Sequence, residues 1–319
     1  MRKLRLASYW ASACGGCDVA ILDTNEHILD IAAVADIVFW PVAVDFKYSD
    51  VEAYDDRSID VCLFHGAVRN SENEHLARLL RQKSEVLVAF GSCAVSGGIP
   101  ALANFKRRED ILNRVYRESP STENPESVLP QPHFTAGDIT LDLPDFYRRV
   151  YALDDIVPVD YYLPGCPPTP ERIWEVFEVI VSGQLPPAGS TVGVADHSLC
   201  HECSRVKKEK KVKTFYRPHE IIPDRENCLL EQGLICLGPV TRGGCGARCI
   251  AANMACRGCY GPMPGIIDQG AKFISTLGSI IDEDRVEDAG AVIDRIVDPA
   301  GTFFRFSMAK SLLKGARQP

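Results

Sequence analysis

Residues 4–17, LRLASYWASACGGC, decide the fold of this chain. The apolar run Leu4–Trp10 has the composition of a β-strand, and it ends in a turn that carries two cysteines and two glycines. Apolar residues at helical spacing then continue from Asp18 to Ala35. The segment therefore predicts a strand, a cysteine-bearing turn and a helix in direct succession.

Strand and helix patterns alternate through the first half of the chain. Further strands are predicted at Ile37–Val44, Asp60–Val68, Glu85–Phe90 and Pro158–Leu163, and helices at Ser71–Lys83, with Ser71 as its N-cap, and at Thr169–Val181. Residues 118–132 are expected to form an excursion or loop. Such alternation favours a parallel sheet with helices on both faces. We therefore expect an α/β fold with a flavodoxin-like, doubly wound parallel sheet.

The alternation ends in SGQLPPAG, residues 182–189. We place a domain boundary here, with a first domain over residues 1–189 and a second over residues 190–319. Residues 190–265 carry eight cysteines and few long apolar runs, so we expect metal coordination to substitute for a hydrophobic core. The second domain is expected to be mostly irregular, with C-terminal helices at Asp268–Ile281, Asp284–Ile296 and Thr302–Leu313.

Four cysteines of the first domain follow predicted strands, namely Cys14, Cys17, Cys93 and Cys166. The carboxyl ends of parallel strands meet at one edge of an open sheet, and ligands bind in the crevice there. Four thiolates that converge at this edge form a tetrahedral sulfur site, which suits Zn²⁺ or an iron–sulfur cubane. A single C-x-x-C is a weak signal, since redox pairs and zinc clips also use it. Three strand-end sites together are more specific.

The second domain holds eight further cysteines: Cys200, Cys203, Cys228, Cys236, Cys245, Cys249, Cys256 and Cys259. They divide into two sets of four, which gives twelve candidate ligands in three sets. The thirteenth cysteine, Cys62, lies in the apolar run IDVCLFHG and is predicted to be a buried small hydrophobe. Three cubanes in series would conduct electrons, whereas three zinc sites would be structural. The residues alone leave both open.

Composition limits the compartment and the partners. The chain has 319 residues, 46% hydrophobic and 24% charged, and its net charge of −8 argues against a nucleic-acid partner. No apolar stretch is long enough to span a membrane, and no secretion signal or twin-arginine pair stands at the start, so a cytoplasmic location is expected. Cytoplasmic thiols stay reduced, so the cysteines point to metal. The basic run at residues 207–213 is expected to be a solvated loop or a docking patch for an acidic redox partner.

The motifs SACGGC (12–17), GSCAVSGGIP (91–100) and LPGCPPTPERI (163–173) resemble the proximal-cluster motifs of [NiFe] hydrogenase small subunits. The resemblance covers nearly the whole chain. It is strongest to the cytoplasmic, methyl-viologen-reducing (F420-non-reducing) type that associates with heterodisulfide reductase. The tail DPAGTFFRFSMAKSLL (298–313) is also similar to this group.

The resemblance implies three [4Fe–4S] clusters in this chain. The implied ligands are Cys14, Cys17, Cys93 and Cys166 for the proximal cluster, Cys245, Cys249, Cys256 and Cys259 for the medial cluster, and Cys200, Cys203, Cys228 and Cys236 for the distal cluster. Cys200 stands where periplasmic relatives have His, and Cys249 lies near a position where they have Pro. The division of the last eight cysteines rests on their order along the chain.

The resemblance also implies an electron-transfer subunit with no catalytic residue of its own. H2 would be split on a [NiFe] large subunit, because this chain has no spare pair of C-x-x-C motifs for nickel. Electrons would then pass through the three clusters to a low-potential acceptor such as heterodisulfide reductase. An iron–sulfur linker protein is a further expected partner.

Three other functions remain open from the sequence. The chain could be the small subunit of an F420-reducing or NAD(P)-linked hydrogenase, a quinone-reductase subunit of the complex I type, or a zinc-stabilised scaffold. The complex I family has adjacent cysteines in its first motif, whereas Gly15 and Gly16 separate Cys14 from Cys17 here. That family also lacks a second domain with eight cysteines.

Overall fold

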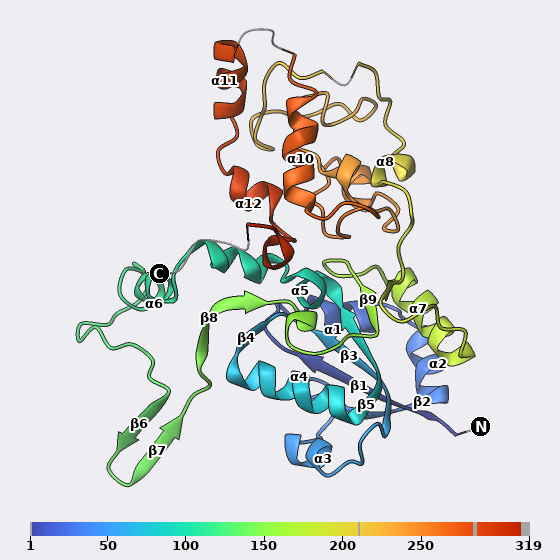
Figure 1. Ribbon diagram of the computed structural model, residues 1–319, viewed down its shortest axis with the longest axis vertical. Helices are drawn as coiled ribbons and strands as arrows, with labels where there is room; N and C mark the ends of the chain where they lie inside the picture. Colours follow the sequence, from blue (N-terminus) through green and yellow to red (C-terminus); the bar gives the residue numbers. More distant parts are fainter. Residues whose placement is uncertain (1, 210, 283–285, 314–319) are drawn as a thin grey trace.

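The computed structural model describes residues 2–209, 211–282 and 286–313 (Figure 1). The strands are β1 (Leu4–Trp10), β2 (Ala35–Phe39), β3 (Ile59–His65), β4 (Val68–Asn70), β5 (Ser84–Phe90), β6 (His133–Ala136), β7 (Ile139–Asp142), β8 (Phe146–Tyr151), β9 (Tyr161–Leu163) and β10 (Ser190–Thr191). The α-helices are α1 (Gly16–Leu22), α2 (His27–Val34), α3 (Tyr48–Glu52), α4 (Ser71–Lys83), α5 (Gly91–Ser96), α6 (Arg108–Tyr116), α7 (Pro170–Ser182), α8 (Leu199–Glu202), α9 (Arg248–Ala251), α10 (Gln269–Gly278), α11 (Val286–Asp294) and α12 (Pro299–Phe303).

Six parallel strands form the main sheet, in the order β10-β9-β5-β3-β1-β2. Without β10, this is the flavodoxin-like order 2-1-3-4-5, whose switch point lies between β1 and β3. The predicted α/β fold class is therefore confirmed. The boundary at residue 189 stays a prediction, and β10 follows directly after it.

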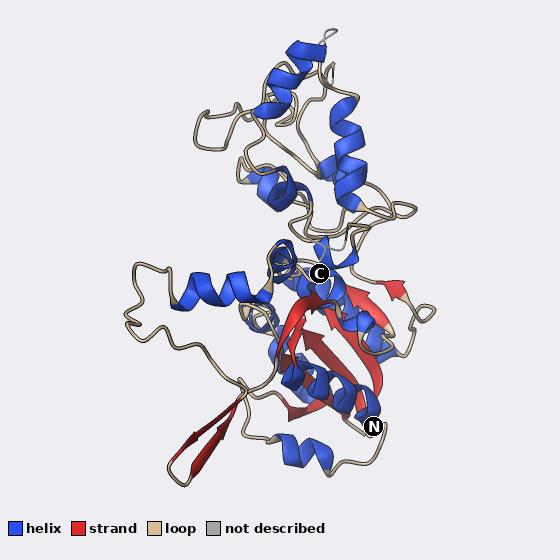
Figure 2. Cartoon of the chain, turned by 60° about the vertical axis from the view of Figure 1, so that its left-hand side comes forward, coloured by secondary structure: helices blue, strands red, loops and turns tan. Residues whose placement is uncertain are grey.

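Apolar residues on alternate positions bury both faces of this sheet. On one face, Leu6 and Val88 pack in a cluster with Ile21 of α1 and Ile173 of α7. On the other face, the neighbouring strand residues form a second cluster with the apolar stripe of α4. Figure 2 shows the strands between these helices. Cys62 is fully buried in β3, so the prediction that it is a small core residue is confirmed.

Several element boundaries differ from the sequence prediction. The helix expected at Asp18–Ala35 is two helices, α1 and α2, because a turn intervenes that includes Asn25 at a φ of 55°. Ser71 is not the N-cap of α4. The side chain of Asn70 holds that place and accepts a hydrogen bond from the Asn73 N–H at 2.8 Å. The strand expected at Pro158–Leu163 is reduced to the three residues of β9.

The excursion after residue 118 leads into a hairpin, β6–β7, that the sequence prediction missed. Phe134 lies opposite Leu141 and Ala136 opposite Ile139, so one face of the hairpin is apolar. Its other face carries the cross-strand pair of His133 and Asp142. Phe134, Ile139 and Leu141 are each more than half exposed, and the hairpin projects away from the sheet (Figure 1). An exposed apolar face of this kind marks a place where another chain can pack.

Residues 190–265 contribute to a buried apolar cluster, whereas the sequence predicted metal coordination in place of a hydrophobic core. Leu199, Phe215 and Leu237 pack there against Phe273 of α10 and Phe303 of α12. The C-terminal helices therefore supply much of the apolar surface that residues 190–265 lack. The helix expected at Thr302–Leu313 is wrong, because α12 spans Pro299–Phe303 and only a short 3₁₀ turn follows at Met308–Lys310. The expected helix start at Asp284 lies outside the described residues.

No helix in the described ranges combines the length and the apolar composition that a membrane crossing requires.

Candidate metal centres

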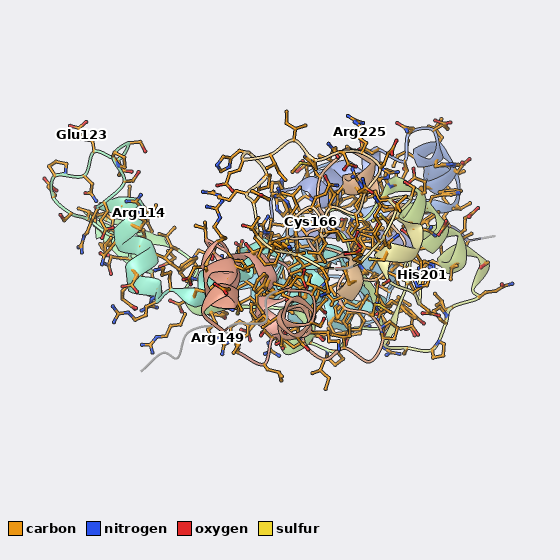
Figure 3. The ribbon with its side chains drawn as sticks, turned by 90° about the horizontal axis from the view of Figure 1, so that it is seen from above. Arg114, Glu123, Arg149, Cys166, His201 and Arg225 are labelled. Carbon is orange, nitrogen blue, oxygen red and sulfur yellow. The ribbon has the colours of Figure 1, made fainter. Side chains whose placement is uncertain are left out.

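The first cysteine group gathers at the carboxyl edge of the main sheet. Cys14 comes from the turn between β1 and α1, Cys17 from the first turn of α1, Cys93 from α5 directly after β5, and Cys166 from the loop after β9. Burial raises the pKa of the Cys17 thiol, and the nearby Cys93, Cys166 and Cys14 thiols raise it further. Burial, then Cys166 and Cys14, also raise the pKa of Cys93 to about 12. The structure thus brings the four predicted residues to one place (Figure 3 labels Cys166).

Two glycines give this group its space. A Cβ at Gly91 would lie 2.5 Å from the Cys17 Sγ, and one at Gly98 would lie 2.7 Å from the Cys93 Sγ. Both glycines also have positive φ angles, of 81° and 52°, which residues other than glycine rarely adopt. The backbone therefore approaches the sulfurs more closely than any other residue at these positions would allow.

Asp18, directly after Cys17, anchors the start of α1 in the interior. Asp18 is 4% exposed, and its Oδ1 accepts a hydrogen bond from the Trp40 indole N–H at 2.7 Å. The Nε2 of fully buried His65 lies 3.0 Å from the same oxygen. These contacts tie the cysteine turn to β2 and β3, because Trp40 follows β2 and His65 ends β3.

The second group comprises Cys245, Cys249, Cys256 and Cys259. Burial, and then the charges of Cys166, Cys245 and Cys249, raise the pKa of the Cys259 thiol to about 12. Burial also raises the pKa of Cys256, with smaller contributions from Cys236 and Cys259. Each of these four thiols therefore lies near at least one other member of the group.

The third group is built around Cys236. Burial, with smaller contributions from the charges of Cys200 and Cys228, raises its pKa to about 12. A Cβ at Gly238 would lie 3.4 Å from the Cys200 Sγ and 3.6 Å from the Cys236 Sγ, so both sulfurs flank this glycine. Cys203 lies at the end of α8, one turn after Cys200.

The three groups form a row. The charge of Cys166 of the first group raises the pKa of Cys259 of the second group. The Cys259 thiol also forms a hydrogen bond with the backbone of Cys166. The charge of Cys236 of the third group raises the pKa of Cys256 of the second group. The second group therefore lies between the other two.

Polar links that the sequence prediction missed join the first group to the second. The Ser92 hydroxyl donates to the Cys259 carbonyl at 2.5 Å and accepts from the Gly165 N–H at 3.2 Å. The Tyr260 hydroxyl accepts from the Thr169 N–H at 3.1 Å. The position of Ser92 beside Cys93 was the one sequence signal for these links, and it did not indicate the partner.

Replacing Ser92 with alanine is expected to loosen this connection. The hydroxyl is buried, and its loss leaves the Gly165 N–H and the Cys259 carbonyl without a partner, which costs about 1–2 kcal/mol. Peptide-level hydrogen exchange should then be about 5- to 30-fold faster in residues 164–169 and 256–261. Ser182→Ala removes a hydroxyl that bonds within its own helix and should leave both segments unchanged. Unchanged exchange in Ser92→Ala would contradict the linking role.

The donor chemistry fits iron–sulfur clusters. Every candidate ligand is a cysteine, and several thiols sit close together with raised pKa values. Thiolates so placed repel one another unless a cation compensates their charge, and metal binding removes the protons. Within the described residues, no three His, Cys, Asp or Glu side chains are arranged to hold a single metal ion.

The chain is similar to known proteins over most of its length. The family model "NADH ubiquinone oxidoreductase, 20 Kd subunit" matches residues 14–180. The iron-sulfur subunit of an F420-non-reducing hydrogenase from Archaeoglobus profundus is 46% identical over 89% of this chain and 90% of its own length. The corresponding F420-non-reducing hydrogenase subunit from Methanothermobacter marburgensis is 34% identical over 98% of this chain and 96% of its own.

Solved structures show the same fold. A chain of an NAD⁺-reducing [NiFe]-hydrogenase superposes with a TM-score of 0.50 and 33% identity, over 58% of this chain and 94% of that chain. A chain of the [NiFeSe] hydrogenase from Desulfovibrio vulgaris Hildenborough superposes with a TM-score of 0.51 over 83% of this chain and 95% of its own. Because the two chains are only 16% identical in sequence, the superposition shows a shared fold and nothing more.

Proposed function

Since the chain belongs to the family of F420-non-reducing hydrogenase iron-sulfur subunits, the small subunits of [NiFe] hydrogenases, we propose that it carries electrons between the large subunit and a separate acceptor protein. As a hydrogenase subunit it is part of an oxidoreductase, and the large subunit is its partner. The active site for H2 lies on that partner.

We propose three [4Fe–4S] clusters as its cofactors, which would accept and release single electrons. The proposed ligands are Cys14, Cys17, Cys93 and Cys166 for the proximal cluster, Cys245, Cys249, Cys256 and Cys259 for the medial cluster, and Cys200, Cys203, Cys228 and Cys236 for the distal cluster. The arrangement of the three cysteine groups in a row supports this proposal. Cys166 lies close enough to Cys259 to raise its pKa, and Cys236 does the same for Cys256. Three structural sites would not need such an arrangement.

The two ends of the row differ in exposure, which supports a direction for the assembly. Cys14 and Cys166 of the first group are exposed at the carboxyl edge of the sheet, whereas the cysteines of the third group are buried or partly buried. A partner that covers this edge would remove the first group from water, so we place the large subunit here. The third group lies at the far end of the row and would face the acceptor.

The acceptor is proposed to be a heterodisulfide reductase, reached through an iron–sulfur linker protein in the cytoplasm. Support comes from the similarity of the three motifs and the tail to the F420-non-reducing type. The iron-sulfur subunit from Archaeoglobus profundus covers 89% of this chain, whereas the NAD⁺-reducing hydrogenase chain covers 58%. This difference favours the F420-non-reducing type over an NAD(P)-linked enzyme.

Metal analysis of the purified complex tests the cofactor assignment directly. Three cubanes predict about twelve iron atoms per small subunit, beyond the iron of the large subunit, and broad absorption near about 400 nm that dithionite bleaches. Subtracting the iron of the separately purified large subunit gives the value for this chain. About three zinc atoms and no visible absorption would instead support a zinc scaffold.

A further inference from the structure

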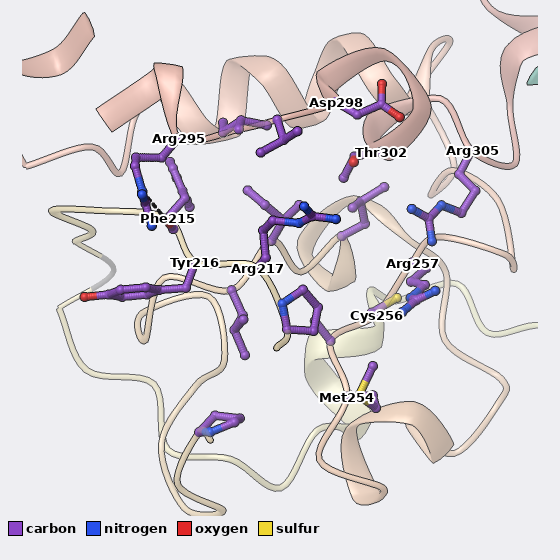
Figure 4. A pocket seen from close by; sticks show the side chains of 18 of the residues that line it. Phe215, Tyr216, Arg217, Met254, Cys256, Arg257, Arg295, Asp298, Thr302 and Arg305 are labelled. Atoms are coloured by element: carbon purple, nitrogen blue, oxygen red, sulfur yellow. Dashed lines mark hydrogen bonds between the residues drawn. The ribbon is translucent and has the colours of Figure 1, made fainter. Parts of the chain in front are cut away.

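A cavity of about 310 Å³ opens beside the second and third cysteine groups (Figure 4). Its walls come from four segments, residues 215–223, 234–237, 253–257 and 295–305. It is accessible from outside, since Val297 on its rim is 69% exposed and Met254 is 39% exposed.

Four arginines line this cavity, although the chain as a whole carries a net charge of −8. Arg295 is paired with Glu220 at 3.2 Å. Within the described part of the chain, Arg217, Arg257 and Arg305 form no ion pair with a carboxylate. Figure 4 shows Arg217 extending across the middle of the cavity and the other two at one side.

Two of these arginines are held near one another against their mutual repulsion. Burial lowers the pKa of Arg305, and the positive charge of Arg257 lowers it further, while Asp298 acts in the opposite direction. Among the described lining residues, Asp298 supplies one negative charge against these arginines, and its Oδ1 also accepts a hydrogen bond from the Gly301 N–H at the start of α12. The cavity therefore has an excess of positive charge that an anion from outside would relieve.

The cavity is adjacent to the proposed clusters and separate from them. Cys256 is the one cysteine among its described lining residues, so it is not the space that a four-thiol cluster would fill. Ile235 and Leu237, the two neighbours of Cys236, also line the cavity. A group bound here would thus lie beside both the second and the third cysteine group.

We propose that this arginine cavity receives an acidic, Asp- or Glu-containing segment of the protein that exchanges electrons with this chain. The proposal rests on the proposed electron-transfer function and names where the acceptor docks. Guanidinium groups bind carboxylates through paired hydrogen bonds. None of the described lining residues is a glycine, so the cavity lacks the flexible backbone loop that usually cradles a nucleotide phosphate. Pro218, Pro223 and Ile296 offer apolar walls to the aliphatic parts of a peptide.

Fluorescence anisotropy with a labelled acidic octapeptide, alternating glutamate and leucine, tests this docking site on the purified complex of large and small subunits. The peptide should bind the unmodified complex, and binding should weaken as salt rises. Arg217→Glu and Arg305→Glu should each weaken it by at least about tenfold. Arg114→Glu makes the same charge change on exposed α6, which contributes no residue to the cavity lining, and should leave binding within about twofold.

Iron content and H2-dependent reduction of methyl viologen, measured on the same samples, separate this proposal from the underlying function. Both should be unchanged in Arg217→Glu, since Arg217 is exposed and lies outside the cysteine groups. A complex without iron or viologen reduction would refute the proposed function. An active complex that does not bind the peptide, or binds it equally well in both cavity variants, would overturn the docking site. Displacement of the peptide by an equal concentration of inorganic phosphate would show a small-anion site and would also overturn it.

Discussion

Replacing Cys17 with alanine is expected to reduce H2-dependent methyl viologen reduction by more than about 100-fold and to lower the iron content from about twelve to about eight atoms per small subunit. Cys17 is the most buried member of the first group, and its sulfur packs directly against the backbone of Gly91. Its loss leaves three ligands at the sheet edge where electrons from the large subunit would enter. Iron analysis and dye reduction with H2 measure the two effects.

Cys62→Ala is the matched control for this experiment. Cys62 is fully buried in β3, and burial raises its pKa to about 12, so it is an uncharged core residue outside the three groups. The substitution should keep the iron content and the rate, with a small loss of stability from the smaller side chain. Full iron content and normal rate in Cys17→Ala would refute its role as a ligand, and loss of iron in Cys62→Ala would show a general folding defect.

The location of the first cysteine group could be predicted because it depends on topology alone. Parallel strands bring their carboxyl ends to one edge, so a cysteine after β1, β5 or β9 must lie near that edge whatever the details of packing. The apolar runs that define those strands are buried on both faces and are visible in the sequence. The fold class and the first group therefore follow from local patterns and one general rule.

Features that depend on pairing between distant segments could not be predicted. Whether Asn70 or Ser71 caps α4 depends on the chain direction before the helix, and both residue types are good caps. The β6–β7 hairpin has short strands and an exposed apolar face, so no burial pattern distinguishes it from a loop. The arginine cavity combines residues more than 80 positions apart, from Arg217 to Arg305, and no spacing along the chain indicates it.

The second and third groups lie between these two cases. Their total of eight cysteines was visible in the sequence, but irregular backbone gives no rule that assigns each one to a group. In the structure, Cys249 is the second residue of the short helix α9, near Cys245, and its charge raises the pKa of both Cys245 and Cys259. This position supports the proposal that Cys249 completes the second group as its fourth ligand.

Replacing Cys249 with alanine is therefore expected to convert the proposed medial [4Fe–4S] cluster into a three-iron cluster. Cys245, Cys256 and Cys259 would remain, and three thiolates can hold a cubane that lacks one iron. The iron content should fall from about twelve to about eleven atoms, and the oxidised protein should show the paramagnetic resonance signal of a three-iron centre. Because the cluster type sets the potential, the medial potential should rise and dye reduction should slow without stopping.

Cys259→Ala provides the contrasting variant for this experiment. Cys259 is held by Ser92 through its carbonyl and lies against Cys166, so its loss removes a ligand at the point where the first and second groups meet. We expect this variant to lose about four iron atoms and most of its dye reduction. Twelve iron atoms in Cys249→Ala would show that Cys249 is not a ligand. A loss of about four iron atoms in Cys249→Ala would show that the remaining three cysteines cannot hold a three-iron centre. Exposed Cys249 would then be as essential to the cluster as Cys259.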